Sequence, residues 1–570
     1  MSDGSITSTS HRHIVAVAAV VVGGALVPLL AAWHYGTFGA ARGDDWSYLR
    51  ALFHWVDAGH LDFNNWVSMT LLGQLVLTAP LALIHHNDTT ALQIATALLG
   101  VVGLLAVEWT VWTLTGRAAR GAFVALVVAA GPMWGVLAVS YMTDVPAFAF
   151  AMLSMAVGVR ALRDQTPSTA FVLASIVLGY VGFTIREYAG VPAAAIVIVA
   201  AMQAFRVGDR RAMFSTLAAG AIAALAVFAF LVVWRTVPNA KSLHPSFPTH
   251  HAVSTFFDKG SDLLRLAGLW LAPLLILRGP VRIVRDSWRA NRIVTAIAAT
   301  AVGAWLATTA IRLPRLAFAG NYFIPDGALG NGVSSGHRPL LVPMGWFDVL
   351  VVIGTLGAVL LVLYAVPGAQ AAFRAARRRD PSALPGVPAT RFIALSAVLY
   401  ALVCAAAAIT GLPLYDRYVL PFVAFLGVLV AMPRPPLPET AATASADTRR
   451  STRQAWGAVI ALALLGAVGT LYTVDSASFD GVRWKVSEAA VHAGWPADSV
   501  GGNFEWVNYY AAVPGTRLIR RSPCVSVIVG TAAVAPGAEV IARGTYHPPL
   551  HPSVPVIAVR TRVPCSRPAH

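Results

Sequence analysis

Gly43-Asp44-Asp45-Trp46-Ser47-Tyr48 is the stretch from which the rest of this chain is best interpreted. Its two adjacent carboxylates follow closely on an apolar segment, Ile14 to Trp33, and lead into an amphipathic one, Tyr48 to Trp55. Charge beside a bilayer is costly to desolvate, so two neighbouring anions there need a reason. One reason is structural, because acids often occupy the first turn of a helix. The other is chemical, and it depends on where the remaining acids of the chain fall.

The composition is that of a membrane protein. Of the 570 residues, 57% are hydrophobic and only 12% are charged, which is about half the charge of a soluble domain. The net charge of +16 could indicate nucleic acid as a partner. Many of the arginines lie instead in short runs between apolar segments, the pattern of cytoplasmic loops, so we exclude nucleic acid. The first apolar segment is too long for a cleavable signal peptide and predicts a retained span.

Apolar segments suited to crossing a bilayer recur along residues 1–474. A span needs about 20 apolar residues, and about 13 segments approach that length. They are 14–33, 90–114, 121–139, 145–163, 168–185, 188–205, 213–236, 262–279, 293–312, 347–366, 391–410, 418–432 and 455–474. We therefore predict an all-α polytopic membrane protein with about 13 transmembrane helices. A small α/β domain over 475–570 is expected to follow it outside the cytoplasm.

The apolar segment 67–84 decides the topology. It contains Gln74, Thr78 and Pro80, which are unusual in a crossing helix. If it does not cross, Arg12 and the arginine-rich loops share one face, which is then cytoplasmic by the positive-inside rule. If it does cross, Arg12 lies opposite the other arginines. We therefore expect a helix that lies in the membrane interface or re-enters the membrane.

This topology brings three acids to the outer face, namely Asp44, Asp45 and Asp144. With 67–84 crossing, Asp44 and Asp144 would lie on opposite faces and could not share a site. Asp144 has an ordinary explanation as well, because Asp followed by Val and Pro is typical of a helix start. A carboxylate at a helix start that faces outward can also bind a cation or a hydroxyl.

The outer face is predicted to carry four loops, 34–89, 140–145, 237–261 and 313–346. The last two are long enough to be either functional or disordered. The loop 237–261 is rich in His and Pro, but its irregular His spacing favours surface display over metal binding. The aromatic and Gly content of 313–346 favours an ordered binding role. Its substrate-binding candidates are Tyr322, His337 and Arg338.

Two polar clusters at outer span boundaries supply basic groups. Arg186 and Glu187 lie between two short spans, and Asp416 and Arg417 precede another. Either pair could be a structural ion pair. An arginine can also bind a phosphate with two parallel hydrogen bonds, and Arg is sparser in the outer loops than in the inner ones. We therefore assign Arg186, and after it Arg417, to phosphate binding.

The region after the last span is too polar to cross a bilayer. Val482 to Ala493 has helical spacing, whereas Pro523 to Val534 and Val554 to Val563 alternate as strands do. Cys524 and Cys565 could pair if this region faces an oxidising exterior. No other chemistry is supported, since a Gly-rich phosphate loop, a metal-binding His pair and a Ser nucleophile elbow are all missing from the sequence.

The stretch Asp44 to Tyr48 resembles the Asp-Glu-x-Arg-Tyr motif in the first outer loop of family 39-like glycosyltransferases of the GT-C superfamily. These include protein O-mannosyltransferases and lipid A aminoarabinose transferases. Thr143-Asp144-Val145-Pro146 looks like their second acidic motif, and Arg186 falls where they often have Lys in a Thr-Lys-Gly turn. The layout of spans, interfacial helices and outer domain is similar too. In this chain Asp45 replaces the motif Glu, and Ser47 replaces the motif Arg.

The resemblance implies an inverting glycosyltransferase of a bacterial plasma membrane. It would move a sugar from a polyprenyl-phosphate donor to an acceptor hydroxyl of a lipid, glycan or protein at the outer face. Asp44 would be the base, with Asp45 and Asp144 as further catalytic residues, and Arg186 and Arg417 would hold the donor phosphate. Substrate-binding residues would be Tyr48, Glu187, Tyr322, His337 and Arg338. No nucleotide is required, and the acids could bind a divalent cation.

Two other classes of protein fit the same acids. A transporter or flippase for a lipid or polyol would use them as a cation or proton site, although carboxylates in pumps lie near mid-bilayer and these lie at the outer boundary. A catalytically inactive scaffold of an envelope complex would bind its partners through the C-terminal domain.

Overall fold

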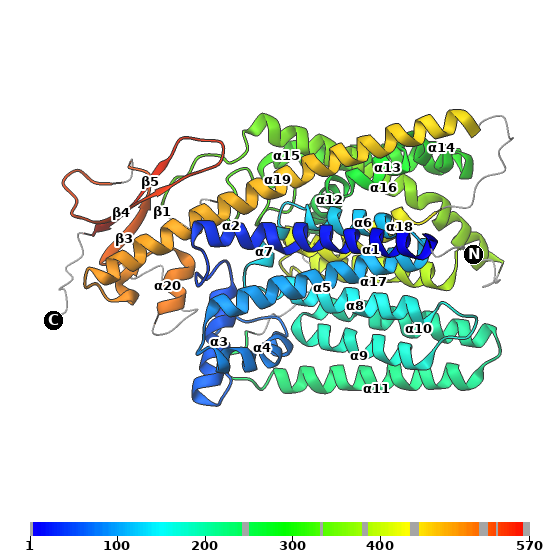
Figure 1. The fold of residues 1–570 in the computed structure, drawn as a ribbon, viewed down its shortest axis with the longest axis horizontal. Helices are drawn as coiled ribbons and strands as arrows, with labels where there is room; N and C mark the ends of the chain where they lie inside the picture. Colours follow the sequence, from blue (N-terminus) through cyan, green and yellow to red (C-terminus); the bar gives the residue numbers. More distant parts are fainter. Residues whose placement is uncertain are drawn as a thin grey trace.

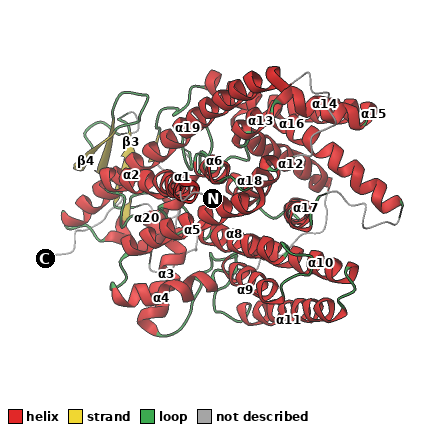
Figure 2. Cartoon of the chain, turned by 45° about the vertical axis from the view of Figure 1, so that its right-hand side comes forward, coloured by secondary structure: helices red, strands yellow, loops and turns green. Residues whose placement is uncertain are grey.

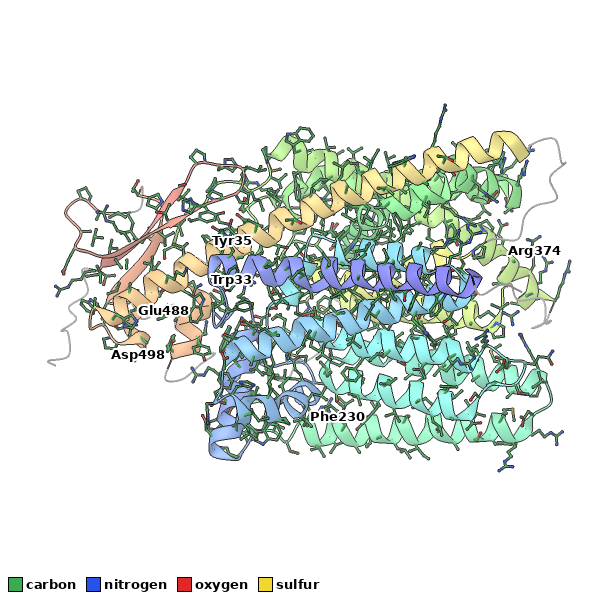
Figure 3. The ribbon with its side chains drawn as sticks, in the orientation of Figure 1. Trp33, Tyr35, Phe230, Arg374, Glu488 and Asp498 are labelled. Atoms are coloured by element: carbon green, nitrogen blue, oxygen red, sulfur yellow. The ribbon has the colours of Figure 1, made fainter. Side chains whose placement is uncertain are left out.

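The computed structural model describes residues 4–241, 250–330, 335–378, 386–433, 444–511, 523–531 and 534–561. Residues 242–249 of the predicted His- and Pro-rich loop, and Cys565, lie outside these ranges. Long helices run side by side through most of the molecule, and a small sheet lies at one end, opposite the N-terminus (Figure 1). Figure 3 places Arg374 at the end of the bundle opposite Glu488 and Asp498.

Nine of the described helical segments are long and apolar enough to cross a membrane, and the chain is a multi-pass membrane protein. They are α1 (Gly4–Val21) with η1 (Val22–Leu26) and α2 (Val27–Tyr35), α5 (Thr89–Thr115), α8 (Asp144–Ala161), η2 (Glu187–Gly190) with α10 (Val191–Arg206), α11 (Arg210–Trp234), α15 (Arg292–Arg312), α16 (Met344–Arg377), α17 (Pro388–Ile409) and α19 (Ala444–His492).

Every one of the 13 predicted spans contains a helix, nine of them in the segments just given. A tenth span is formed if α12 (His250–Trp270) and α13 (Ala272–Arg278) count as one helix bent by 60°. The other three predicted spans are α6 (Ala118–Ala129) at 12 residues, α9 (Thr169–Ile185) at 17 and α18 (Val419–Ala431) at 13. The helices α6 and α18 are shorter than the roughly 17–25 residues of a crossing helix, whereas α9 lies at the lower end of that range.

The segment 67–84 forms a short helix, α4 (Leu72–Ile84), of 13 residues. It follows α3 (Asp45–Ala58), and both lie at the end of the bundle that carries the strands (Figures 1 and 2). On α4, Val76, Leu77, Leu83 and Ile84 are exposed, whereas Gln74 and Thr78 are buried. A short helix with one exposed apolar side matches the expectation of an interfacial or re-entrant segment.

The C-terminal domain is built around five strands. The order is β1 (Ser335–Gly336), β3 (Val525–Val529), β5 (Val554–Arg560) and β4 (Val540–Tyr546), and β2 (Val500–Gly501) also pairs with β3. The pairs β3–β5 and β5–β4 are antiparallel, while β1 and β2 run parallel to β3. Because β1 belongs to the outer loop 313–346, that loop is tied into the domain.

The predicted domain boundary at residue 474 falls inside α19, which continues unbroken to His492. One helix therefore belongs to both parts of the chain, and the helix predicted at Val482 to Ala493 is its last section. The two predicted strands are present as β3 and β5. The strand β4 escaped prediction because its Ala542, Arg543 and Gly544 interrupt the β-branched alternation.

Short helices complete the fold: α7 (Trp134–Ala138), α14 (Pro280–Ala290), η3 (Pro314–Leu316), η6 (Asp416–Tyr418), η8 (Ala497–Ser499) and α20 (Phe504–Tyr510). Of these, η6 and α20 matter for the site. Cys524 is disulfide-bonded, whereas Cys404 in α17 is free.

The closest helix approach involves glycines of α12 and α16. A Cβ on Gly268 would clash with the backbone of Gly354, Gly357 and Ala358. Backbone atoms cannot move aside as the end of a flexible side chain can. A side chain larger than that of glycine is therefore not tolerated at position 268, where α12 crosses α16. Gly303 in α15 offers a comparison, since a Cβ there meets nothing within 4 Å.

Gly268→Val should lower the apparent melting temperature and the monodisperse yield in detergent, because overpacking costs about 1–3 kcal/mol or more. Gly303→Val is the matched control and should melt close to the parent protein. Equal melting temperatures for the two variants, measured by differential scanning fluorimetry, would contradict the packing described.

Candidate active site

Four residues predicted to share the outer face meet at the end of the bundle that carries the sheet. Asp44 directly precedes α3, and Asp144 begins α8. Arg186 joins α9 to η2 in extended conformation, and Arg417 lies in η6. The side chain of Asp44 makes no capping hydrogen bond to α3. The structural explanation of this acid as a helix cap therefore fails.

Arg417 links the two acids. Its Nη2 lies 3.2 Å from Oδ2 of Asp44, and its Nε lies 3.8 Å from Oδ2 of Asp144. Arg186 pairs with the same oxygen of Asp144 at 2.8 Å through its Nη1. The four side chains form an alternating series of two acids and two bases, which we call the charged cluster (Asp44, Arg417, Asp144 and Arg186).

Both guanidinium groups are buried among tyrosines. Arg186 donates to the hydroxyl of Tyr418 at 2.7 Å. Arg417 lies 5.1 Å from the ring centre of Tyr415 and 5.8 Å from that of Tyr322. Burial lowers the pKa of each arginine, but Asp144 and the neighbouring tyrosines together outweigh it, so both pKa values lie well above the ordinary one. Both residues are therefore fixed positive charges.

Asp44 is the member of the charged cluster that solvent reaches. Its side chain is 24% exposed, against 4% for Arg417, 2% for Arg186 and 0% for Asp144. Its Oδ1 accepts a hydrogen bond of 3.1 Å from the indole Nε1 of Trp66. An accessible carboxylate beside two buried cations can take a proton from an incoming hydroxyl.

Three buried polar atoms at the charged cluster have no hydrogen-bond partner within the described parts of the chain. They are the hydroxyl of Tyr48, Oδ1 of Asp144 and Nε of Arg417. Burial, and then the charge of Asp44, raises the pKa of Tyr48 well above its ordinary value, so its hydroxyl keeps its proton. Each such atom costs about 1–3 kcal/mol when unpaired. Their concentration in one place suits a site that completes its hydrogen bonds with a ligand.

Asp45 braces two loops. Its Oδ1 accepts the backbone N–H of Arg42 at 2.5 Å, and its Oδ2 accepts that of Tyr141 at 3.1 Å. Burial raises the pKa of Asp45 although both hydrogen bonds oppose the shift. With both oxygens engaged, Asp45 holds the first outer loop against 140–145. Its predicted part in catalysis remains a prediction, and its contacts are those of a positioning group.

Asp416 and Glu187 also hold loops in place. Oδ2 of Asp416 accepts three successive backbone N–H groups at 3.0, 2.6 and 2.7 Å, those of Asn321, Tyr322 and Phe323. This contact keeps Tyr322 beside Arg417. Oε1 of Glu187 accepts the backbone N–H of Thr70 at 3.0 Å, which ties the start of α4 to η2. Glu187 therefore braces a loop instead of joining the charged cluster.

The outer loop 313–346 is divided between two places. Its Tyr322 lies at the charged cluster, whereas His337 and Arg338 lie on the C-terminal domain. The backbone of His337 donates to Val529 at 3.3 Å, and Nη2 of Arg338 lies 3.7 Å from Asp475 of α19. These contacts hold this part of the loop on the C-terminal domain, and substrate binding by His337 and Arg338 stays a prediction.

Sequence reasoning missed a second buried charge network, formed by Arg42, Asp480, Arg483 and Glu505. Nε of Arg42 lies 2.9 Å from Asp480, which also pairs with Arg483 at 2.5 Å. Nη1 of Arg483 lies 3.8 Å from Glu505. No motif signals these residues, although Arg42 next to the acid pair could have been noted.

Metal binding finds no support in the ranges given above, since no three His, Cys, Asp or Glu side chains there could hold a metal ion together. The space between Asp44 and Asp144 holds the guanidinium of Arg417. Two cavities of about 220 and 430 Å³ lie instead between α2 and α19, and Val27, Thr470 and Thr473 line both.

The chain is similar in overall structure to several solved membrane proteins. One is ArnT from Cupriavidus metallidurans bound to undecaprenyl phosphate, at 13% identity and a TM-score of 0.43 over 99% of both chains. Another is the oligosaccharyltransferase AglB from Archaeoglobus fulgidus in complex with an inhibitory peptide and a dolichol-phosphate. It shares 12% identity, with a TM-score of 0.40 over 92% of this chain and 61% of AglB. No protein-family model and no curated protein matches the chain.

Glu505 makes the stability of this end of the molecule depend on pH. Burial raises its pKa from 4.5 to about 7, against the opposing effect of Arg483. A raised carboxyl pKa stabilises the fold below pH 4.5, and that stability is lost as pH rises towards 7. The change amounts to about 1–3 kcal/mol.

Glu505→Gln should remove this pH dependence, because the amide cannot ionise. We expect the variant to match the parent protein near pH 5 and to melt at a higher temperature near pH 8. Melting curves at both values test this. A variant that is less stable than the parent at pH 8 would show that Glu505 is buried as a stabilising anion.

Proposed function

We propose that this chain is a glycosyltransferase of the GT-C type that moves a sugar from a polyprenyl-phosphate donor to an acceptor hydroxyl. The observation that carries the proposal is the charged cluster, with an accessible carboxylate next to two buried guanidinium groups and three unpaired polar atoms. A lipid-linked donor needs the bilayer for its tail and cations for its phosphate. An acceptor hydroxyl needs a base, because it is a poor nucleophile until its proton is accepted.

The distribution of arginines supports an orientation. With the arginine-rich loops and the N-terminus in the cytoplasm, the charged cluster and the C-terminal domain face outward across the plasma membrane. Donor and acceptor would then meet at the outer face. The acceptor would be a hydroxyl of a lipid, a glycan or a protein.

In the proposed reaction, Asp44 accepts the proton of the acceptor hydroxyl as its oxygen forms a bond to the anomeric carbon. The bond from that carbon to the phosphate oxygen breaks, and its electron pair leaves with the phosphate. Direct displacement inverts the configuration at the anomeric carbon. Arg417 and Arg186 stabilise the charge that develops on the leaving phosphate, since fixed positive charge acts most strongly away from water.

Arg417 couples donor binding to the base. Its Nη2 pairs with Asp44 at 3.2 Å, so the guanidinium and an acceptor hydroxyl compete for the same carboxylate. A donor phosphate competes for the same guanidinium and releases Asp44 to the acceptor. Tyr48 and Oδ1 of Asp144 are placed to hold hydroxyls of the sugar or of the acceptor.

Asp44→Asn should lower kcat by about 10²–10⁴-fold, the usual contribution of a general base. Thermal stability should be unchanged, because Asn keeps an oxygen for Trp66. Activity is measured in proteoliposomes that contain polyprenyl-phosphate sugars, by mass spectrometry of the product. Asp57→Asn, an exposed acid at the other end of α3, is the control. Near-parental turnover of Asp44→Asn, or counterflow of substrate without a covalent product, would contradict the proposal, the latter in favour of a transporter.

Tyr48→Phe separates a substrate contact from a structural one. The Tyr48 hydroxyl has no protein partner among the described residues, so removing it should leave stability unchanged or slightly raised. We expect a fall in kcat/KM of about 10-fold, as for the loss of one hydrogen bond to substrate. Parental kinetics in this variant would show that the hydroxyl does not contact the substrate.

A further inference from the structure

The C-terminal domain reaches the residues around Asp44 through α20. This helix packs against α3, the helix that Asp44 precedes, and lies at the same end of the bundle (Figures 1 and 2). Asn503 caps its N-terminus, with Oδ1 accepting the backbone N–H of Trp506 at 2.7 Å. The cap places Phe504 and Glu505 in the first turn, where Glu505 reaches Gly43 and Phe504 reaches the indoles of Trp46 and Trp66.

Glu505 contacts the backbone next to Asp44. Its Oε1 accepts the N–H of Gly43 at 3.4 Å. Gly43 has a φ of +66°, a conformation that favours glycine, and a Cβ there would lie 2.6 Å from the hydroxyl of Tyr322. Gly43 is thus confined between the C-terminal domain and the outer loop 313–346. The direction in which Asp44 leaves the backbone depends on this residue.

Phe504 contacts the hydrogen-bond donor of Asp44. Its ring centre lies 5.5 Å from that of Trp66 and 6.1 Å from that of Trp46, and the two indoles lie 5.7 Å apart. Trp66 donates to Oδ1 of Asp44. The rotamer of Trp66 therefore depends on a side chain from a part of the sequence more than four hundred residues away.

Arg50 clamps α20 onto α3. Its Nη1 donates to the carbonyls of Asn508, Tyr509 and Ala511 at 3.1, 2.9 and 2.7 Å. These carbonyls lie at the C-terminal end of α20, where a helix lacks internal partners and carries partial negative charge. The guanidinium satisfies them and fixes α20 relative to Asp44. The hydrogen bonds from Arg50 fix the C-terminal end of α20, and the contacts of Phe504 and Glu505 fix its N-terminal end.

We propose that Phe504 and Glu505 are positioning residues for Asp44, so that docking of α20 sets the orientation of the base. The proposal rests on the proposed function, since it presumes that Asp44 accepts the proton of the acceptor. A purely structural role for α20 would affect stability alone. A positioning role affects kcat in addition, because a reacting group displaced by about 1 Å can lose about 10²-fold in rate.

The test compares Phe504→Ala with Val556→Ala in full-length protein reconstituted in proteoliposomes. Val556 is buried in β5 of the same domain and has no part in the contacts with Asp44. We expect Phe504→Ala to lower kcat by about 10–100-fold, with KM for the donor changed less than about twofold. Val556→Ala should keep parental kcat, and Phe504→Tyr should restore most of the rate.

Hydrogen–deuterium exchange provides a readout that does not depend on activity. Peptides covering residues 36–47 should exchange faster in Phe504→Ala than in Val556→Ala. Glu505→Leu, which removes the acceptor of the Gly43 N–H, should show the same faster exchange and a lower kcat. It serves as the second variant if Phe504→Ala does not fold.

Equal kcat and equal exchange for Phe504→Ala and Val556→Ala would overturn the positioning role. The proposed function would stand in that case, because it depends on the loss of rate in Asp44→Asn. Faster exchange with parental kcat would likewise overturn the role, since Asp44 would then tolerate a mobile loop.

Discussion

The guanidinium of Arg417 between Asp44 and Asp144 is the interaction on which the outer end of this protein depends. Burying two acids near one another is unfavourable unless a cation lies between them. Arg417 supplies that cation, and Arg186 neutralises the second acid from its other side. Removing Asp144 would leave the two buried guanidinium groups with only the partly exposed Asp44 as a counter-charge. Elements far apart in the sequence are therefore held together by the same charges that the proposed chemistry uses.

Around the charged cluster, most polar contacts fix loops. Three carboxylates accept hydrogen bonds from backbone N–H groups of loops, namely those of Asp45, Asp416 and Glu187. Such contacts fix the positions of loop residues as packing fixes those of core residues. This matters because a base and a phosphate-binding group must be held at a defined distance and orientation. The continuous helix α19 and the strand β1 connect the same loops to the C-terminal domain.

The sequence predicted the helical bundle because apolar segments of span length are the strongest signal that a chain carries. It also led to Asp44, Asp144, Arg186 and Arg417, since acids and arginines at outer span boundaries are costly enough to be noticed. The number of spans stays a prediction at α6, α9 and α18, whose 12, 17 and 13 residues are short for a crossing helix. The placement of His337 and Arg338 could not be foreseen, because it depends on a two-residue strand, β1, pairing with β3. No sequence pattern singles out Glu505, and only the structure shows its contacts with Gly43 and Arg483.

A structure of the full chain in lipid nanodiscs with added polyprenyl phosphate tests the central claim most directly. The account predicts phosphate density within hydrogen-bonding distance of Arg417 and Arg186, with Asp44 and Asp144 on the same side of the membrane and the Arg417–Asp44 pair opened. Phosphate bound away from both arginines, or the two acids on opposite faces of the membrane, would contradict it.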